Sequence, residues 1–369
     1  MKKIAQLRNN YIANGPTTLV LQTSLKLKEK GFEPLMISGG GEYVQEIESK
    51  GISHLTLPEL SFSERSFGNV VKAVFGLKRI IEDERIDLIH AHNAAVFYIA
   101  YWASKITKRK CPVILTNHGV EYRPNYQWRN WIYKIFPSTI IAVSEYTKRI
   151  LISLGVNEER VKVVYNGVDL NRFDISKKEK YSKEIRDEFE IDASSFLIGI
   201  VGNMNIKGHD NLIRAFSSIS AKYPKVELLL VGNGVIYDEC VKLANELKVS
   251  KRVHFAGFRT DVEKFHASFD LYTLPSKEGE MLPISILESM AFGNTFVASS
   301  LSGIPELVKN GEGLLVKPND VNDLTEKLIY LLDNKDLREE MEICCLKSAR
   351  EIYNIDSVMM KTIEIYQEG

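Results

Sequence analysis

The sequence of 369 residues has little cysteine, no long apolar run and a formal net charge of zero. Its four cysteines show no metal-ligand spacing, and adjacent Cys344 and Cys345 are poor disulfide partners, so reduced, cytoplasmic chemistry is expected. Lys+Arg and Asp+Glu both number 48, so no global field points to nucleic acid. The longest apolar run, residues 94–103, is shorter than the ~20 residues of a membrane-spanning helix. Residues 1–8 are basic with no apolar core behind them, so no signal peptide is expected.

Short apolar runs rich in β-branched residues alternate with helical patterns from end to end of the chain. This alternation predicts βαβ units, parallel strands and helices on both faces of each sheet. Strands are expected at residues 3–7, 33–38, 87–92, 112–118, 139–144 and 161–165, and again at 196–202, 226–232, 252–257, 271–275, 295–299 and 313–317. The charged stretch 174–192 lies between the two series and is interpreted as a solvated helical connector. The prediction is an α/β protein with two doubly wound, Rossmann-like domains, residues 1–173 and 174–353, and a ligand site in the cleft between them.

Two glutamates mark the stretch around which we interpret the rest of the chain. Glu280 lies in a loop after the apolar run ending at Leu274, and Glu288 lies in the helix that follows, for which Pro283 suits the first position. The amides around Leu282 are then the free donors of a helix N-terminus, which attracts phosphate. Carboxylates hold hydroxyl groups by accepting their hydrogen bonds, so the pattern fits a nucleotide-sugar. The alternative is a solvated loop glutamate beside a surface helix glutamate.

The spacing of Glu280 and Glu288, with seven residues between them, resembles the motif of retaining glycosyltransferases of family 4, which have the two-domain GT-B fold. The resemblance implies that Glu280 contacts the donor sugar, that Glu288 holds the ribose, and that Met281, Leu282 and Pro283 face the donor. The family usually has Gly where this chain has Met281, and Gly permits a closer backbone approach than Met does.

A second group of positions follows the first strand of the second series. Gly202 ends that strand, and Lys207 precedes a helix, an arrangement that suits phosphate binding without the spacing of a P-loop. Lys207 matches a family lysine, and the resemblance implies that it contacts the donor phosphates. The second family cation, an arginine, is replaced here by Asn203, which carries no charge. A solvated loop lysine is the alternative interpretation.

Other family-like positions lie at further predicted strand ends. Gly15 opens a helix after the first strand without a G-x-G-x-x-G pattern, so it is either part of a donor- or acceptor-facing loop or an ordinary capped turn. His118 ends the fourth strand, and the resemblance implies that it reaches the donor sugar. Phe258 and Arg259 follow a strand end where the family seats the base. In this family the last helix, here about residues 354–369, packs back on the first domain.

No metal site is expected. His90 and His92 alternate onto one face of a strand, but no third ligand is placed beside them, and the chain has no Asp-x-Asp pair to bridge a diphosphate-bound cation. Aromatic and basic residues interleave over residues 123–136, which fits either a helix packed on the sheet or an interfacial helix on anionic lipid.

The predicted function is transfer of a sugar, with retention, from a nucleoside diphosphate donor to an acceptor hydroxyl, in cell-surface polysaccharide or glycolipid synthesis. The expected catalytic residues are Lys207, Glu280 and His118, with no cofactor and no metal. The acceptor is a saccharide, a lipid-linked molecule or a small molecule; no nucleic acid is expected as a partner. The location is cytoplasmic, with peripheral contact at the inner membrane face as an option. The alternatives are a nucleotide-sugar 2-epimerase and a non-catalytic GT-B partner protein.

Overall fold

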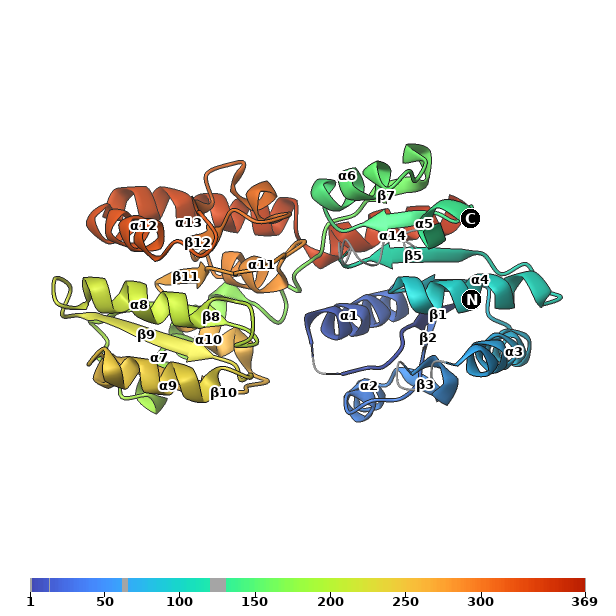
Figure 1. Ribbon diagram of the computed structural model, residues 1–369, viewed down its shortest axis with the longest axis horizontal. Coiled ribbons are helices and arrows are strands. Elements are labelled where there is room, and N and C mark those ends of the chain that lie inside the picture. The colour runs from blue at the N-terminus through green and yellow to red at the C-terminus, as the bar shows by residue number, and fades with distance from the viewer. Residues whose placement is uncertain (1, 13, 62–65, 120–130, 369) are drawn as a thin grey trace. The chain divides into compact units, whose positions relative to one another are not determined.

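The computed structural model describes residues 2–12, 14–61, 66–119 and 131–368. The chain forms two compact units, Met1–Asn166 with Asp356–Gly369, and Gly167–Ile355. Each unit has a parallel sheet covered by helices on both faces (Figure 1). The predicted two-domain α/β architecture is therefore confirmed. The expected boundary after residue 173 falls inside the second unit.

In the described part of the first unit, the sheet has seven strands in the order β3-β2-β1-β4-β5-β6-β7. They are β1 (Lys3–Leu7), β2 (Glu33–Ser38), β3 (Ser53–Thr56), β4 (Leu88–Ala91), β5 (Val113–Asn117), β6 (Ile140–Ala142) and β7 (Val161–Val163). All except β3 overlap predicted runs. The prediction missed β3 because this edge strand, Ser-His-Leu-Thr, contains no apolar run and none of its residues is fully buried.

The helices of the first unit pack their apolar sides onto this sheet. They are α1 (Gly15–Glu29), α2 (Val44–Ser49), α3 (Phe67–Asp83), α4 (Ala94–Ile106), α5 (Trp131–Ile135), α6 (Glu145–Ser153) and α14 (Ile355–Glu368). One core joins α3, α4 and the central strands through residues such as Leu77, Phe97 and Leu115. Of the predicted aromatic helix over 123–136, residues 123–130 lie outside the described residues; Phe136, just after α5, is buried against Phe97 and Tyr101.

The chain passes from the first unit to the second at the predicted Asn-Gly-Val-Asp turn. The Val168 amide donates to the Tyr353 carbonyl at 2.7 Å, and the Ile355 amide donates to the Val168 carbonyl at 3.0 Å. A Cβ atom on Gly167 would lie 2.7 Å from the Ile355 Cα, so the close approach of these two segments requires glycine. After Ile355 the chain continues into α14, most of which belongs to the first unit.

In the second unit, whose residues are all described, the strand order is β10-β9-β8-β11-β12-β13. The strands are β8 (Phe196–Val201), β9 (Val226–Val231), β10 (Val253–Gly257), β11 (Leu271–Leu274), β12 (Phe296–Ser299) and β13 (Gly313–Val316). The helices are α7 (Lys178–Glu188), α8 (His209–Ser220), α9 (Tyr237–Glu246), α10 (Val262–Ser268), α11 (Ile284–Ala291), α12 (Val321–Asp333) and α13 (Lys335–Glu351). All six strands overlap predicted runs.

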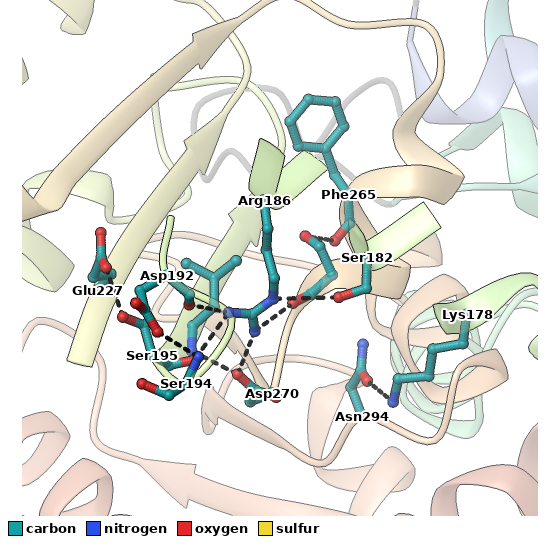
Figure 2. A network of polar contacts seen from close by, with 12 residues as sticks. Lys178, Ser182, Arg186, Asp192, Ser194, Ser195, Glu227, Phe265, Asp270 and Asn294 are labelled. Atoms are coloured by element: carbon teal, nitrogen blue, oxygen red, sulfur yellow. Dashed lines mark hydrogen bonds and ion pairs between the residues drawn. The ribbon is translucent and has the colours of Figure 1, made fainter. Parts of the chain in front are cut away.

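The charged stretch 174–192 was predicted to be a solvated helical connector; it forms the helix α7, with mostly exposed or half-buried side chains, but this helix belongs to the second unit. Its helix α7 is fastened to the second unit by Arg186, whose side chain is 11% exposed (Figure 2). The guanidinium binds the Asp270 carboxylate at 2.8 Å and donates to the Ser195 carbonyl at 2.9 Å. Lys178, at the start of the helix, donates to the Phe292 carbonyl at 2.8 Å. Few apolar residues are needed here because polar contacts fix the helix.

Candidate functional site

The candidate donor site lies at the carboxyl edge of the second sheet. The strand order reverses between neighbouring strands β8 and β11, and ligands of doubly wound sheets bind outside such a reversal. The loop after β8 carries Gly202, Asn203 and Lys207, and the loop after β11 carries Glu280. The fold therefore brings residues about 70 positions apart in the sequence to one point of the sheet.

Lys207 and Glu280 form an ion pair across these two loops. The Lys207 Nζ lies 2.7 Å from the Glu280 Oε1, and the two side chains are 19% and 14% exposed. Ser276 donates its hydroxyl to the same carboxylate oxygen at 3.3 Å. The pair thus places one fixed positive charge and one carboxylate, both partly open to solvent, where a diphosphate and a sugar hydroxyl could bind them.

Gly202 leaves the space through which the Lys207 side chain runs. A Cβ atom on Gly202 would lie 2.3 Å from the Lys207 Cδ and 2.7 Å from its Cε, so the lysine side chain occupies the space that any other residue would fill. The backbone of Gly202 has φ of 150°, a region that favours glycine. The glycine predicted from the strand-end pattern is therefore needed for the position of the lysine.

Contacts that the sequence did not predict fasten the two loops together. The Lys277 amide donates to the Ile206 carbonyl at 2.7 Å, and the Lys277 Nζ lies 2.6 Å from the Asp210 Oδ2. Gly208 precedes α8 with φ of 79°, and a Cβ atom there would lie 2.0 Å from the Pro275 carbonyl oxygen. The backbone around Lys207 and Glu280 is consequently held in place before any ligand binds.

Glu288 lies on α11, the helix that follows the Glu280 loop in the chain. Its side chain is 10% exposed, and its Oε2 lies 3.3 Å from the Nε2 of fully buried His266. Pro283 was predicted as the first helical residue, but it precedes the helix, with ψ of 120°, and α11 begins at Ile284. The helix start expected to face phosphate is present, one residue later than predicted.

Asn203 and Met281 are two positions at which the sequence departs from the family pattern. Asn203 is exposed, and its side-chain oxygen accepts a hydrogen bond from the Asn205 amide at 3.0 Å. Met281 and Leu282 lie in the bend before α11; Met281 is half-buried and Leu282 is buried. Next to this bend, the Gly303 amide donates to the Glu280 carbonyl at 3.1 Å, which ties the loop to the segment after β12.

Phe258 and Arg259 follow β10, where the base was predicted to bind. Phe258 is 62% exposed. Arg259, in contrast, is bound by two carboxylates: its Nε lies 2.9 Å from the Asp261 Oδ1, and its Nη1 pairs with Glu188. These hydrogen bonds raise the pKa of Arg259. Its contacts fasten α7 to the turn before α10.

The remaining predicted residues, Gly15 and His118, belong to the first unit. Gly15 is the exposed first residue of α1, and Asn14 caps that helix by accepting from the Thr17 amide at 2.9 Å. His118 follows β5, and its Nε2 lies 3.1 Å from the Nδ1 of His92, which follows β4. Both histidines therefore lie at the carboxyl edge of the first sheet.

His92 and His118 are part of a buried polar network that only the structure reveals. The His92 Nε2 lies 2.6 Å from the Gln6 Oε1, an acceptor, so neutral His92 donates there and its Nδ1 accepts from His118. His90 lies between the Tyr366 hydroxyl and the Thr116 hydroxyl, at 2.6 Å from each. Burial lowers the pKa of His90 and of His118 to about 3 and that of His92 well below its usual value. The three imidazoles are thus uncharged at neutral pH.

Acidification is expected to destabilise the protein through these histidines and through His209, whose pKa burial also lowers to about 3. Because the folded pKa values lie below the unfolded value near 6.5, the unfolded chain binds protons first as pH falls. Each such histidine lowers the free energy of unfolding by roughly 1.4 kcal/mol for each pH unit below that value. Within the part of the chain that the structure describes, neither ring nitrogen of His209 has a hydrogen-bond partner. We therefore expect His209→Leu to reduce by about one the number of protons taken up on unfolding, measured as the slope of the urea unfolding free energy against pH. Equal slopes in variant and wild type would contradict this.

The described residues contain neither a metal-binding cluster nor a membrane-spanning helix. No group of three or more His, Cys, Asp or Glu side chains there could hold a metal ion. No helix in the same residues is long and apolar enough to cross a bilayer.

Two doubly wound units, with a lysine–glutamate pair at the strand reversal of the second, define a two-domain α/β protein of the GT-B type. The family model for glycosyl transferases group 1 matches residues 182–343, and that for glycosyltransferase family 4 matches residues 13–172. The chain belongs to these group 1, family 4-like glycosyltransferases.

Relatives and solved structures agree with this assignment. The chain is 27% identical to an N,N'-diacetylbacillosaminyl-diphospho-undecaprenol α-1,3-N-acetylgalactosaminyltransferase of Campylobacter jejuni, over 92% of each chain. It is 25% identical to the N-acetyl-α-D-glucosaminyl L-malate synthase of Bacillus anthracis, over 79% of this chain and 77% of that protein. The fold matches Anabaena HepE, crystallised with UDP and glucose, with a TM-score of 0.85 at 22% identity over 100% of both chains.

Proposed function

We propose that this glycosyltransferase moves a sugar from a nucleoside diphosphate donor to an acceptor hydroxyl with retention of anomeric configuration. The observation that carries the proposal is the Lys207–Glu280 pair at the strand reversal of the second sheet. HepE, a structural relative, was crystallised with UDP and with UDP-glucose, which supports a nucleotide-sugar donor here.

In the proposed reaction, the bond between the anomeric carbon and the diphosphate breaks, and negative charge develops on the leaving diphosphate. Lys207 supplies positive charge for that group, and the amides at the start of α11 supply hydrogen-bond donors. Asn203 can donate a hydrogen bond but adds no charge. Because the family's second cation is missing at Asn203, Lys207 carries a larger share of the stabilisation.

The two carboxylates have separate proposed roles. Glu280 accepts hydrogen bonds from the donor sugar, and Glu288 accepts them from the ribose hydroxyls. Since Glu280 already pairs with Lys207, we assign no covalent nucleophile, and retention proceeds by attack on the face that the diphosphate leaves. His118, which is uncharged at neutral pH, is proposed to position the sugar as a hydrogen-bonding group.

The acceptor remains open among a saccharide, a lipid-linked molecule and a small hydroxy compound. The name of the Campylobacter jejuni relative includes an undecaprenol-linked sugar, and the name of the Bacillus anthracis relative includes malate. Peripheral membrane contact, a cytoplasmic location and a role in polysaccharide or glycolipid synthesis stay predictions.

A panel of nucleotide-sugars tests the proposal in two conditions, with EDTA and with added magnesium. We expect one donor to raise the melting temperature by mass action and to be consumed when acceptors are supplied, equally in both conditions. Activity that EDTA abolishes and magnesium restores would contradict the metal-free reaction. Epimer formed from donor alone would identify an epimerase, and binding or turnover of no donor would favour a non-catalytic partner protein.

A further inference from the structure

Arg8, the residue after β1, is half-buried, with two guanidinium nitrogens shielded from water. Within the described residues, its Nε and Nη1 atoms have no hydrogen-bond partner, and no carboxylate forms an ion pair with it. Burial lowers the pKa of Arg8, but an arginine keeps its charge in a protein. An unpaired charge with little access to water is costly, and a bound oxyanion would compensate it.

The position of Arg8 in the fold is that of a ligand site. The order of the first sheet reverses between β1 and β4, so Arg8 and His92 follow the two strands that flank the reversal. The His92 amide donates to the Leu7 carbonyl at 3.0 Å, which brings the two strand ends together. His118 follows the next strand, β5.

Among the described residues, the groups that share this sheet edge with Arg8 are uncharged. His92 and His118 follow neighbouring strands there, and burial together with the positive charge of Arg8 lowers the pKa of both imidazoles, so they stay neutral. Tyr11, whose ring is fully buried, also lies near Arg8, and burial raises its pKa. Arg8 therefore has neutral neighbours where a structural arginine would have carboxylates.

The backbone that carries Arg8 is held rigidly. The Tyr11 amide donates to the Gly40 carbonyl at 2.9 Å, and the Gly39 amide donates to the Asn9 carbonyl at 2.7 Å. A Cβ atom on Gly41 would lie 2.1 Å from the Tyr11 carbonyl oxygen, so the two segments touch. The backbone at the base of the Arg8 side chain is thus fixed, so only the side chain itself has to be ordered when an anion binds.

We propose that Arg8 binds an oxyanion, a phosphate or carboxylate group, and that this group belongs to the acceptor. The assignment to the acceptor rests on the proposed function, because the donor diphosphate has its own contacts at Lys207. Arginine suits such a group, since its planar fork can hold two oxygens of a phosphate or carboxylate. The acceptor is therefore an anionic molecule.

The first test measures anion binding without any transfer reaction. Inorganic phosphate is titrated into Lys207→Ala protein, which lacks the other candidate phosphate contact, with and without Arg8→Gln. We expect Arg8→Gln to weaken phosphate binding roughly 10- to 100-fold, as for loss of a hydrogen bond to a charged group. Arg79→Gln, which removes an exposed arginine paired with Asp83, is the control and should change nothing. Equal phosphate binding with and without Arg8 would overturn the proposal.

The free energy of unfolding gives a second test. Replacing an arginine with a structural role would lower it, whereas replacing an anion-binding Arg8 should not. In buffer without phosphate or carboxylate ions, Arg8→Gln should be at least as stable as wild type, because it removes an uncompensated buried charge. A clear loss of stability in that buffer would overturn the proposal. Arg8→Lys should keep part of the phosphate affinity but lose the two-oxygen geometry.

Binding and kinetics then separate the two sources of the anion. With Arg8→Gln alone, donor affinity should stay at the wild-type value while the acceptor KM rises at least about tenfold. Lost donor affinity would assign the anion to the donor and overturn the acceptor assignment. If no donor binds wild type, the proposed function fails, but the phosphate titration still decides whether Arg8 is an anion site.

Discussion

Lys207→Ala is expected to lower kcat/KM for glycosyl transfer by roughly 10²- to 10³-fold, the range for losing one donor to a developing negative charge. Lys207 is the fixed positive charge at the strand reversal of the second sheet, and Asn203 stands where the family has a second cation. Donor affinity should fall as well, because the lysine contacts the diphosphate before the bond breaks. The fold should persist, because the Glu280 carboxylate keeps 14% exposure to solvent and still accepts the hydrogen bond from the Ser276 hydroxyl.

Lys277→Ala is the matched control for this prediction. Lys277 lies in the same loop as Glu280 and pairs with Asp210 at 2.6 Å, with the lysine 31% and the aspartate 26% exposed. Its replacement also deletes one lysine and one ion pair, but not the proposed donor contact. Donor titrations and initial rates should separate the two variants. Equal losses in both would show that Lys207 supports the loops and does not bind the diphosphate.

Gly202→Ala should lower transfer by about 10²-fold while the second unit stays folded, because the added methyl group displaces the lysine that contacts the diphosphate. Its Cβ would lie 2.3 Å from the Lys207 Cδ, and only the flexible side chain can move away. The positive φ of 150° adds a backbone cost of roughly 1–3 kcal/mol. Rates and urea unfolding curves should therefore diverge: activity falls far more than stability.

Gly311→Ala separates the backbone cost from the effect on Lys207. Gly311 also has a positive φ, 86°, but the nearest atom to its Cβ position is the Cys344 Sγ at 4.0 Å. This variant should lose a similar stability and keep wild-type rates. If Gly202→Ala loses no more activity than Gly311→Ala, the lysine does not depend on the glycine.

Apolar periodicity was sufficient to predict the architecture. Every strand with a fully buried apolar run was found, because parallel strands covered on both faces leave a continuous signal. The edge strand β3 left none, since water solvates much of Ser53–Thr56. The attachment of helix α7 to the second unit was missed for a related reason: its anchor is the charged residue Arg186, and composition does not distinguish a buried guanidinium from a solvated one.

The candidate site was predictable to the extent that strand ends and spacing define it. Lys207 and Glu280 were expected in one place, and they form an ion pair. Arg259 matched the pattern too, but whether an arginine is free or bound by carboxylates depends on neighbours distant in sequence, here Glu188. The unpaired charge of Arg8 was missed for the same reason. A cation directly after the first strand was the only available signal.

The pairing of His90 with Tyr366 bears on how the protein is made. Tyr366 follows the second unit in the chain, so the histidine cluster of the first unit stays without its phenol until the second unit has been translated. The second unit, Gly167–Ile355, is continuous and is translated before Tyr366 is added. The half of the polypeptide that leaves the ribosome first is thus the half that is completed last.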